Sequence, residues 1–493
     1  MKRVATLVLL GALMQANNLQ ITNLSVDWAN RTVTFTISWE NGWRLSTPPA
    51  NWDAAWVFVK FRQCNALEDP WTHGQISTTL TDHTFPAQLQ PVLSDGSAVG
   101  IDPAPNNLGV MLRHTNTGTF ATVGPYTVTL RVTNLPTSGS YDIAVFGIEM
   151  VFIPEGAYTL GTLGGRYNWG DQAAYAFDQN GNNDNPHVPY NIISENAISL
   201  RWAGSGATSI SVPAAFPKGY KAFHVMKYEI SQGQYADFLN TLPGNTANLR
   251  YPGNFGINRN RLQSGGSYPN VYQSDRPDRA QNYLSWHDVC AYLDWAALRP
   301  ITEMEYEKIC RGPGASAGEY AWGSTNITPG TTIGITPENG TEVFTNPNAN
   351  CTYNNVTYTG GDGDRGPVRV GIHAKVGSPS REASGATYYG VLDMSGNVWE
   401  AVVMVSNPSG AVGTPSYDGK WGDGVLDWAT GRANESTWPL GNPGGFGSRG
   451  GSWGNFWYDL RVSSRICSVP GHTCLWTRNP DGRHEHHGGR GAR

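Results

Sequence analysis

The chain has 493 residues and a formal net charge of −5; charged residues make up 15%, and Gly (59), Tyr (22) and Trp (18) are abundant. This charge gives no general attraction to nucleic acid or anionic lipid, so neither is expected as a partner. The length predicts at least two domains, and the composition predicts irregular backbone braced by large aromatic side chains.

The first residues are typical of an export signal. Basic residues precede an apolar run from Val4 to Met14, and the small Ala16 follows before the sequence becomes polar. This order predicts a signal peptide over residues 1–16 and a protein that is secreted, extracellular or held at the cell surface. A short membrane anchor is the alternative, but the run is well short of the roughly 20 residues that a spanning helix requires. No other stretch predicts a membrane span.

Residues 17–147 have the pattern of an all-β unit. The stretch RTVTFTISWE alternates apolar and polar residues, with Val33, Phe35 and Ile37 on one face. Similar strands follow at 54–62, 126–135 and 141–149, separated by Pro, Gly, Asn and Asp clusters. We expect a β-sandwich that attaches or assembles, because no acid pair, metal cluster or nucleophile is evident within it.

Helices are predicted only in the second half, each with its own cap. Ser231, Ser285 and Thr302 precede helical patterns, and Thr302 is followed three residues later by Glu305, as in a capping box. The neighbouring acids Glu303 and Glu307 are interpreted as structural rather than catalytic, since first-turn carboxylates complement the helix dipole.

Five segments then occur in the order of one known family. They read EMVFIPEGAYTLG (149–161), MKYEISQGQYADFLN (226–240), LSWHDVCAYLDWAALRPITEMEYEKICRG (284–312), YYGVLDMSGNVWE (388–400) and RGGSW (449–453). Together they resemble the formylglycine-generating enzyme, or sulfatase-modifying factor, domain, a loop-rich variant of the C-type lectin fold. The resemblance implies a loop-rich α+β domain over residues 148–493, following the all-β sandwich.

The resemblance also implies a bound Ca²⁺. In DMSGNVWE the family's ligands correspond to the side chains of Asp393 and Glu400 and the backbone carbonyls of Gly396 and Val398, hard oxygen donors on a tight turn. A packed turn stapled by Trp399 is the alternative.

A second calcium site of the family resembles the region of Asn350, Asp362 and Asp364. The spacing here departs from the family pattern.

The redox chemistry of the family is not expected. The oxidases carry two cysteines after RGGS, at positions that correspond to Asn455 and Leu460 here, and neither residue supplies a thiolate. Disulfides are expected among the six cysteines of an exported chain. The resemblance implies a bridge from Cys310 to the terminal segment, placed at Cys467, with Cys467–Cys474 as the competing pair.

A histidine-rich segment, HEHH (484–487), lies near the end of the sequence. Its composition suits a metal, but adjacent histidines in a Gly/Arg-rich stretch are more typical of a solvated run. The histidine triad spacing of related nonheme-iron oxidases is absent.

The segment after RGGS is a candidate ligand face. In the lectin-like fold this region is exposed, and some retroelement-diversified binding proteins with this fold vary the same residues. Aromatic bodies with polar tips are typical of binding hot spots. The candidate residues are Trp453, Asn455, Phe456, Trp457, Tyr458, Asp459, His472 and Trp476. Packing of these aromatics into the core is the alternative.

The sequence therefore favours an exported, non-catalytic binding or structural protein. Its partner is expected to be a protein or glycan ligand, or other copies of itself through the N-terminal unit. A metal-dependent oxidoreductase of the same family is the alternative.

Overall fold

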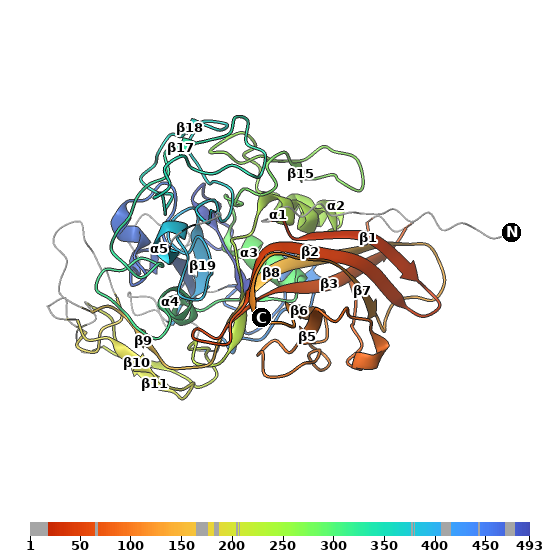
Figure 1. Cartoon of the computed structure of the whole chain (residues 1–493), viewed down its shortest axis with the longest axis horizontal. Helices are drawn as coiled ribbons and strands as arrows, with labels where there is room; N and C mark the ends of the chain where they lie inside the picture. Colours follow the sequence, from red (N-terminus) through yellow and green to blue (C-terminus); the bar gives the residue numbers. More distant parts are fainter. Residues whose placement is uncertain are drawn as a thin grey trace.

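The computed structural model describes most of the chain and shows a mostly β protein with few helices (Figure 1). The described residues are 18–64, 68–163, 176–181, 187–203, 206, 208–375, 378, 380–405, 416–441, 444–468 and 479–493. The expected signal peptide over residues 1–16 lies outside them. No helix in the described ranges is both long enough and apolar enough to cross a membrane.

The N-terminal strands form two sheets. The smaller is antiparallel, with order β1-β2-β7, and consists of β1 (Gln20–Asp27), β2 (Thr32–Arg44) and β7 (Gly118–Arg131). Along β2 the side chains of Val33, Phe35 and Ile37 are fully buried and alternate with partly exposed ones, as the sequence predicts. A two-residue period places one face of this strand against a core and the other toward solvent.

The larger sheet has eight strands and includes strands from the first and the last part of the chain. Its path is β16-β24-β13-β8-β3-β6-β5, with β4 (Thr72–His73) beside β3. These strands are β3 (Asp53–Gln63), β5 (Leu89–Val92), β6 (Val110–His114), β8 (Tyr141–Ile153), β13 (Phe223–Met226), β16 (Arg299–Pro300) and β24 (Gly491–Ala492). The expected boundary between residues 147 and 148 lies inside β8, which pairs with β3 on one side and β13 on the other.

Both faces of the central strands are covered. One face of β3, including Ala55 and Val57, shares a core with the β1-β2-β7 sheet. The opposite face, including Trp56 and Phe58, packs against residues of the helices in the second half of the chain. A strand buried on both faces carries no polar alternation, and this explains the nearly continuous apolar run AAWVFVKF.

The helices begin where the sequence predicts. Ser231, Ser285 and Thr302 each cap a helix through a complete capping box, in which side chain and backbone satisfy each other. The helices are α1 (Gln232–Asn240), α2 (Gly244–Arg250), α3 (Trp286–Trp295), α4 (Glu303–Arg311) and the single turn α5 (Arg381–Ser384).

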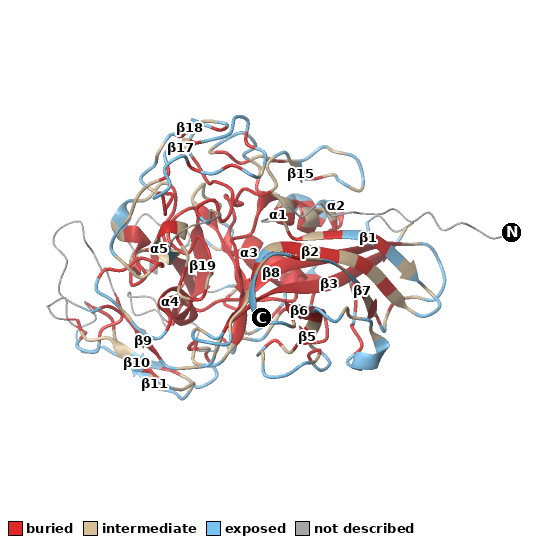
Figure 2. Ribbon diagram, in the orientation of Figure 1, coloured by how far each residue is buried: buried red, intermediate tan, exposed pale blue. Residues whose placement is uncertain are grey.

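A second, three-stranded sheet supports the candidate site. It has the order β22-β19-β23 and consists of β19 (Trp399–Val403), β22 (Phe446–Arg449) and β23 (His487–Gly488). The remaining two-stranded ribbons are β9 (Tyr158–Leu160) with β10 (Tyr190–Ile192), β11 (Ile198–Leu200) with β12 (Ile210–Val212), β14 (Leu262–Gln263) with β15 (Gln273–Ser274), β17 (Thr332–Ile333) with β18 (Thr359–Gly360), and β20 (Leu426–Asp427) with β21 (Arg432–Ala433). Figure 2 shows buried backbone concentrated along β8, β19, α3 and α4, with exposed residues on the outer loops.

Candidate functional site

The segment 449–465 is held at both ends by the acids of α4. Arg449 donates to Glu303 at 3.1 Å and to Glu307 at 2.6 Å, and Arg465 binds both oxygens of Glu303 at 2.6 and 2.9 Å. All four side chains are fully buried. The prediction that the first-turn acids of this helix are structural is consistent with these contacts, since bidentate pairs of this kind fix the geometry of the groups they join.

Cys310, on the same helix, is a free and fully buried thiol, so the predicted Cys310–Cys467 disulfide is wrong. The expected covalent link between α4 and the terminal segment is replaced by the Glu303–Arg465 ion pair. Arg465 stands close to the position where the resemblance implied a cysteine, and its guanidinium makes the connection electrostatically. The competing Cys467–Cys474 pair involves Cys474, which lies outside the described residues.

The two redox positions of the family hold residues with packing roles. The amide of Asn455 donates to Asp459 at 3.0 Å, and Leu460 is fully buried beside Tyr320, Trp322 and Cys351. Burial raises the pKa of the Cys351 thiol well above its ordinary value. A buried, protonated thiol is a poor nucleophile and a poor metal ligand.

The predicted ligand face divides into a buried and an exposed part. Trp453 is 3% exposed and packs with Tyr228 and Val398, so for this residue the alternative of core packing is correct. Phe456 and Trp457 are exposed, at 56% and 38%. Tyr458 stacks on Phe456 with ring centroids 5.6 Å apart. Tyr458 is half-buried and also contacts Trp457, with ring centroids 5.6 Å apart, and we call these three neighbouring aromatics the aromatic tip (residues 456–458).

The base of the aromatic tip is polar and ordered. Asp459 is 6% exposed and accepts the Asn455 amide, and burial raises the pKa of its carboxyl to about 6. The guanidinium of Arg461 lies 4.9 Å from the Trp457 ring centroid, in a cation–π contact. The other predicted ligand residues, His472 and Trp476, lie outside the described residues.

The HEHH segment packs against this region rather than forming a solvated run. His487 belongs to β23 and is buried, and the His486 ring contacts Trp453 edge-on at 4.6 Å. The His484 ring centroid is 4.9 Å from that of His486 and 5.5 Å from that of His487. Burial lowers the pKa of His486 to about 4, so this imidazole is neutral at ordinary pH.

The DMSGNVWE turn places its two acids in a buried polar cluster. Asp393 accepts the backbone N–H of Gly371 at 2.6 Å, and Arg490 lies 2.7 Å from Glu400. A third carboxylate, Glu229, accepts the Val398 N–H at 3.0 Å. Sequence reasoning missed Glu229 and Arg490, which reach this turn from distant parts of the chain.

Burial disfavours the ionised forms of the three carboxyl groups in this cluster. Burial raises the pKa of Glu400 to about 7, and it also raises the pKa values of Asp393 and Glu229. A divalent cation would lower the cost of keeping these groups ionised, whereas Arg490, 2.7 Å from Glu400, already places a positive charge there. Within the described ranges no three His, Cys, Asp or Glu side chains form a metal-binding group. The predicted site uses only two carboxylates together with two backbone carbonyls, and it stays a prediction.

The second calcium region has different electrostatics. Asp362 is bound by Arg276 at 2.5 Å and by Arg279 at 2.9 Å, whereas the Asn350 side chain accepts the Thr328 N–H. Asp364 accepts from the neighbouring backbone N–H of residue 365. Two guanidinium groups on Asp362 oppose a cation there, so this arrangement does not favour a second Ca²⁺.

A family model described as the sulfatase-modifying factor enzyme 1-like domain matches residues 146–473, two thirds of the chain. The chain belongs to this family. The match includes the aromatic tip, the DMSGNVWE turn and all of α4.

Individual relatives match over shorter lengths. The chain is 32% identical over 131 residues to a formylglycine-generating enzyme of Thermomonospora curvata, covering 26% of this chain and 34% of that enzyme. It is 26% identical over 205 residues to the formylglycine-generating enzyme of Bos taurus, covering 36% and 48%. A solved structure, Treponema denticola variable protein 1, aligns over 70% of this chain and 95% of its own at 14% identity, with a TM-score of 0.27.

A cleft that the sequence did not reveal lies where N-terminal residues meet the sulfatase-modifying-factor-type domain. It has a volume of about 550 Å³, within the range of small-molecule sites. Trp43 and Phe120 line it from the N-terminal strands, and Arg381, Tyr388 and Tyr389 line it from the family domain. Three stretches distant in sequence supply these residues, so no local motif marks the cleft.

Proposed function

We propose that the chain is an exported, non-catalytic binding protein of the sulfatase-modifying factor family. In this proposal the aromatic tip contacts a protein or glycan ligand, and the N-terminal sheets attach or assemble the protein at a cell surface. One observation carries it: Phe456 and Trp457 are exposed on a segment whose two ends are clamped to α4 by Arg449 and Arg465.

This arrangement suits recognition because the segment is already ordered in the free protein, so binding a ligand costs little additional conformational entropy. Large aromatic surfaces on rigid backbone contribute contact area with few rotors left to freeze. The cation–π contact of Arg461 further restricts the Trp457 ring. A ligand that covers Phe456 and Trp457 therefore gains the burial of their apolar surface without a large entropic penalty.

The residues at the redox positions support a non-catalytic function. Asn455 and Leu460 supply no thiolate, and burial raises the pKa of both Cys310 and Cys351. Oxidation of a substrate cysteine on a soft metal requires accessible thiolates, which these two buried thiols do not offer.

A metal-dependent oxidoreductase is the second candidate. The relatives named above are formylglycine-generating enzymes, and the rings of His484, His486 and His487 lie close together. Imidazole nitrogens bind copper and iron. In this alternative the metal is held by ligands that the sequence motifs do not reveal, since no three His, Cys, Asp or Glu side chains of the described residues form a metal-binding group.

Binding to a glycan array and to a displayed peptide library tests the first candidate. We expect Trp457→Ala to weaken the selected interaction by roughly 30-fold, which is typical of a hot-spot residue. Phe255→Ala is the matched control, because Phe255 is similarly exposed, at 44%, outside the aromatic tip. Equal binding by Trp457→Ala and wild-type protein contradicts the proposal. Stoichiometric copper or iron, with aldehyde formation on a cysteine peptide, selects the oxidoreductase.

A further inference from the structure

A buried lysine and two carboxylates meet where the large sheet joins the N-terminal strands to the family domain. Lys227 Nζ lies 3.0 Å from Glu149 Oε2 and 3.5 Å from Asp53 Oδ2, and the three side chains are only 2% exposed. The register brings them together: Glu149 pairs with Ala55, two residues from Asp53 on the same face of β3. Lys227 follows β13 directly and donates its backbone N–H to Glu149.

The Asp53 carboxyl group is fixed by two further donors. The indole N–H of Trp39 donates to Oδ2 at 3.0 Å, and the backbone N–H of Trp43 donates to Oδ1 at 2.8 Å. Donors on both oxygens polarise the carboxyl carbon and would stabilise negative charge on the oxygens if a nucleophile added to it. Lys227 Nζ lies 3.5 Å from Asp53 Oδ2, so the nitrogen is held beside the carboxyl group that it would attack.

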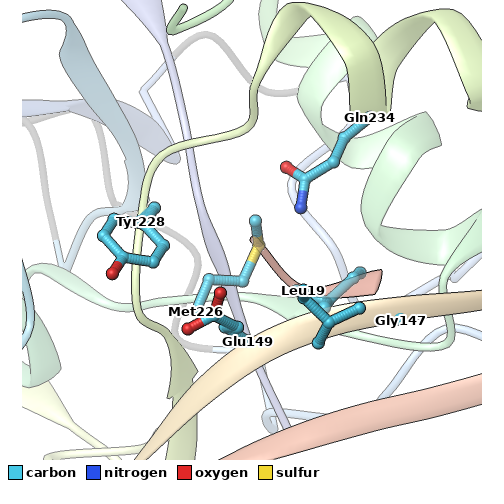
Figure 3. A pocket seen from close by; sticks show the side chains of 7 residues that line it. Leu19, Gly147, Glu149, Met226, Tyr228 and Gln234 are labelled. Carbon is cyan, nitrogen blue, oxygen red and sulfur yellow. The ribbon is translucent and has the colours of Figure 1, made fainter. Parts of the chain in front are cut away.

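The surroundings exclude bulk water. The Trp43 and Tyr228 rings lie 5.0 and 5.5 Å from Lys227 Nζ. Beside Glu149 is a cavity of about 10 Å³, lined also by Met226, Tyr228 and Gln234, which is enough for one water molecule (Figure 3). The second oxygen of Glu149, Oε1, is buried without a hydrogen-bond partner among the described residues.

From this geometry we propose that Lys227 and Asp53 form an intramolecular isopeptide bond, with Glu149 as the proton-transferring group. The Lys227 ammonium gives a proton to Glu149, and the neutral amine attacks the carboxyl carbon of Asp53. As the C–N bond forms and one C–O bond of the Asp53 carboxylate breaks, one of the two amine protons and the proton on Glu149 pass to the departing oxygen. The other amine proton stays on the amide nitrogen. The products are an amide and one water molecule, so no oxidant, nucleotide or metal is required.

The protonation states support this sequence. Burial raises the pKa of Glu149 to about 8, so this group both accepts and returns a proton near neutral pH. Burial also raises the pKa of Asp53. Burial alone would lower the pKa of Lys227, but the nearby Glu149, Tyr228 and Asp53 raise it, so the amine depends on Glu149 for deprotonation.

The bond would join the first residue of β3 to the family domain covalently. This role is separate from ligand recognition. The bond would keep the N-terminal sheets covalently attached to the domain that carries the aromatic tip. Asp53 and Lys227 are distant in sequence, so the bond closes a long loop and restricts the unfolded chain.

Intact-mass spectrometry and peptide mapping of the purified full chain test the proposal. We expect a mass lower by one water molecule and a branched peptide joining residues 53 and 227. Glu149→Gln and Lys227→Arg should show the full mass while remaining folded by circular dichroism. Lys60→Arg is the control, because Lys60 is also buried but donates to the Gly424 carbonyl, and it should keep the mass deficit.

Asp53→Asn gives a second, independent measurement. An asparagine at this position reaches the same amide by losing ammonia instead of water, so its final mass should equal that of the cross-linked wild-type protein. Recovery of separate, full-mass peptides containing Asp53 and Lys227 from folded wild-type protein overturns the proposal and leaves the triad as an ordinary buried ion pair. A mass deficit that maps to any other pair of residues also overturns it.

Discussion

Replacing Glu303 with Gln tests whether the clamp under the aromatic tip stabilises the fold. The carboxylate of Glu303 binds Arg465 through two hydrogen bonds and Arg449 through one, and none of these side chains is exposed. The substitution keeps the size of the side chain but leaves Arg465 without its carboxylate. Breaking a buried ion pair by removing one partner costs about 3–5 kcal/mol, because a charge stays buried without compensation.

Urea denaturation followed by tryptophan fluorescence measures this loss. The matched control is Asp275→Asn, which removes the Arg261–Asp275 pair at 2.6 Å, where the two side chains are 35% and 44% exposed. Exposed pairs contribute about 0–1 kcal/mol and are screened by salt, so this variant should stay close to wild type. Similar losses for the two variants would refute the reasoning, as would strong salt dependence of the Glu303→Gln loss.

Three further outcomes are expected. Chelation of Ca²⁺ should lower the melting temperature, and Glu400→Gln should remove most of that sensitivity; a melting curve unchanged after exhaustive chelation contradicts the calcium site. Because burial raises the pKa of Asp459 to about 6 from 3.8, the folded protein keeps a proton that the unfolded chain releases. Asp459 should therefore contribute a fall of roughly 2–3 kcal/mol in the unfolding free energy between about pH 4 and 6, and Asp459→Asn should reduce the measured fall by that amount, as followed by denaturation at several pH values. Non-reducing peptide mapping should recover Cys310 as a free thiol; a peptide joining Cys310 to Cys467 would contradict the structure.

Local features of the fold were predictable from the sequence because neighbouring residues determine them. The caps at Ser231, Ser285 and Thr302 depend on a hydroxyl and a side chain three residues later, and all three are present. The alternation in β2 predicts its buried face for the same reason. The family could also be recognised, since its motifs are short and contiguous in the chain.

Parts of the candidate site depended on long-range contacts and could not be predicted. Trp453 and Phe456 are three residues apart and equally aromatic, yet one packs with Tyr228 and the other faces solvent. The predicted Cys310–Cys467 bridge failed because spacing alone does not reveal that Arg465 already connects this segment to Glu303.

The sequence by itself therefore determined the helix starts, the faces of the amphipathic strands and the family, since each follows from residues close together in the chain. The tertiary structure alone decided that β8 joins the N-terminal strands and the family domain in one sheet, and that Asp53, Glu149 and Lys227 meet at this junction. The physical reason is that pairing register and burial bring together residues far apart in sequence, and no local pattern encodes which distant charges become neighbours.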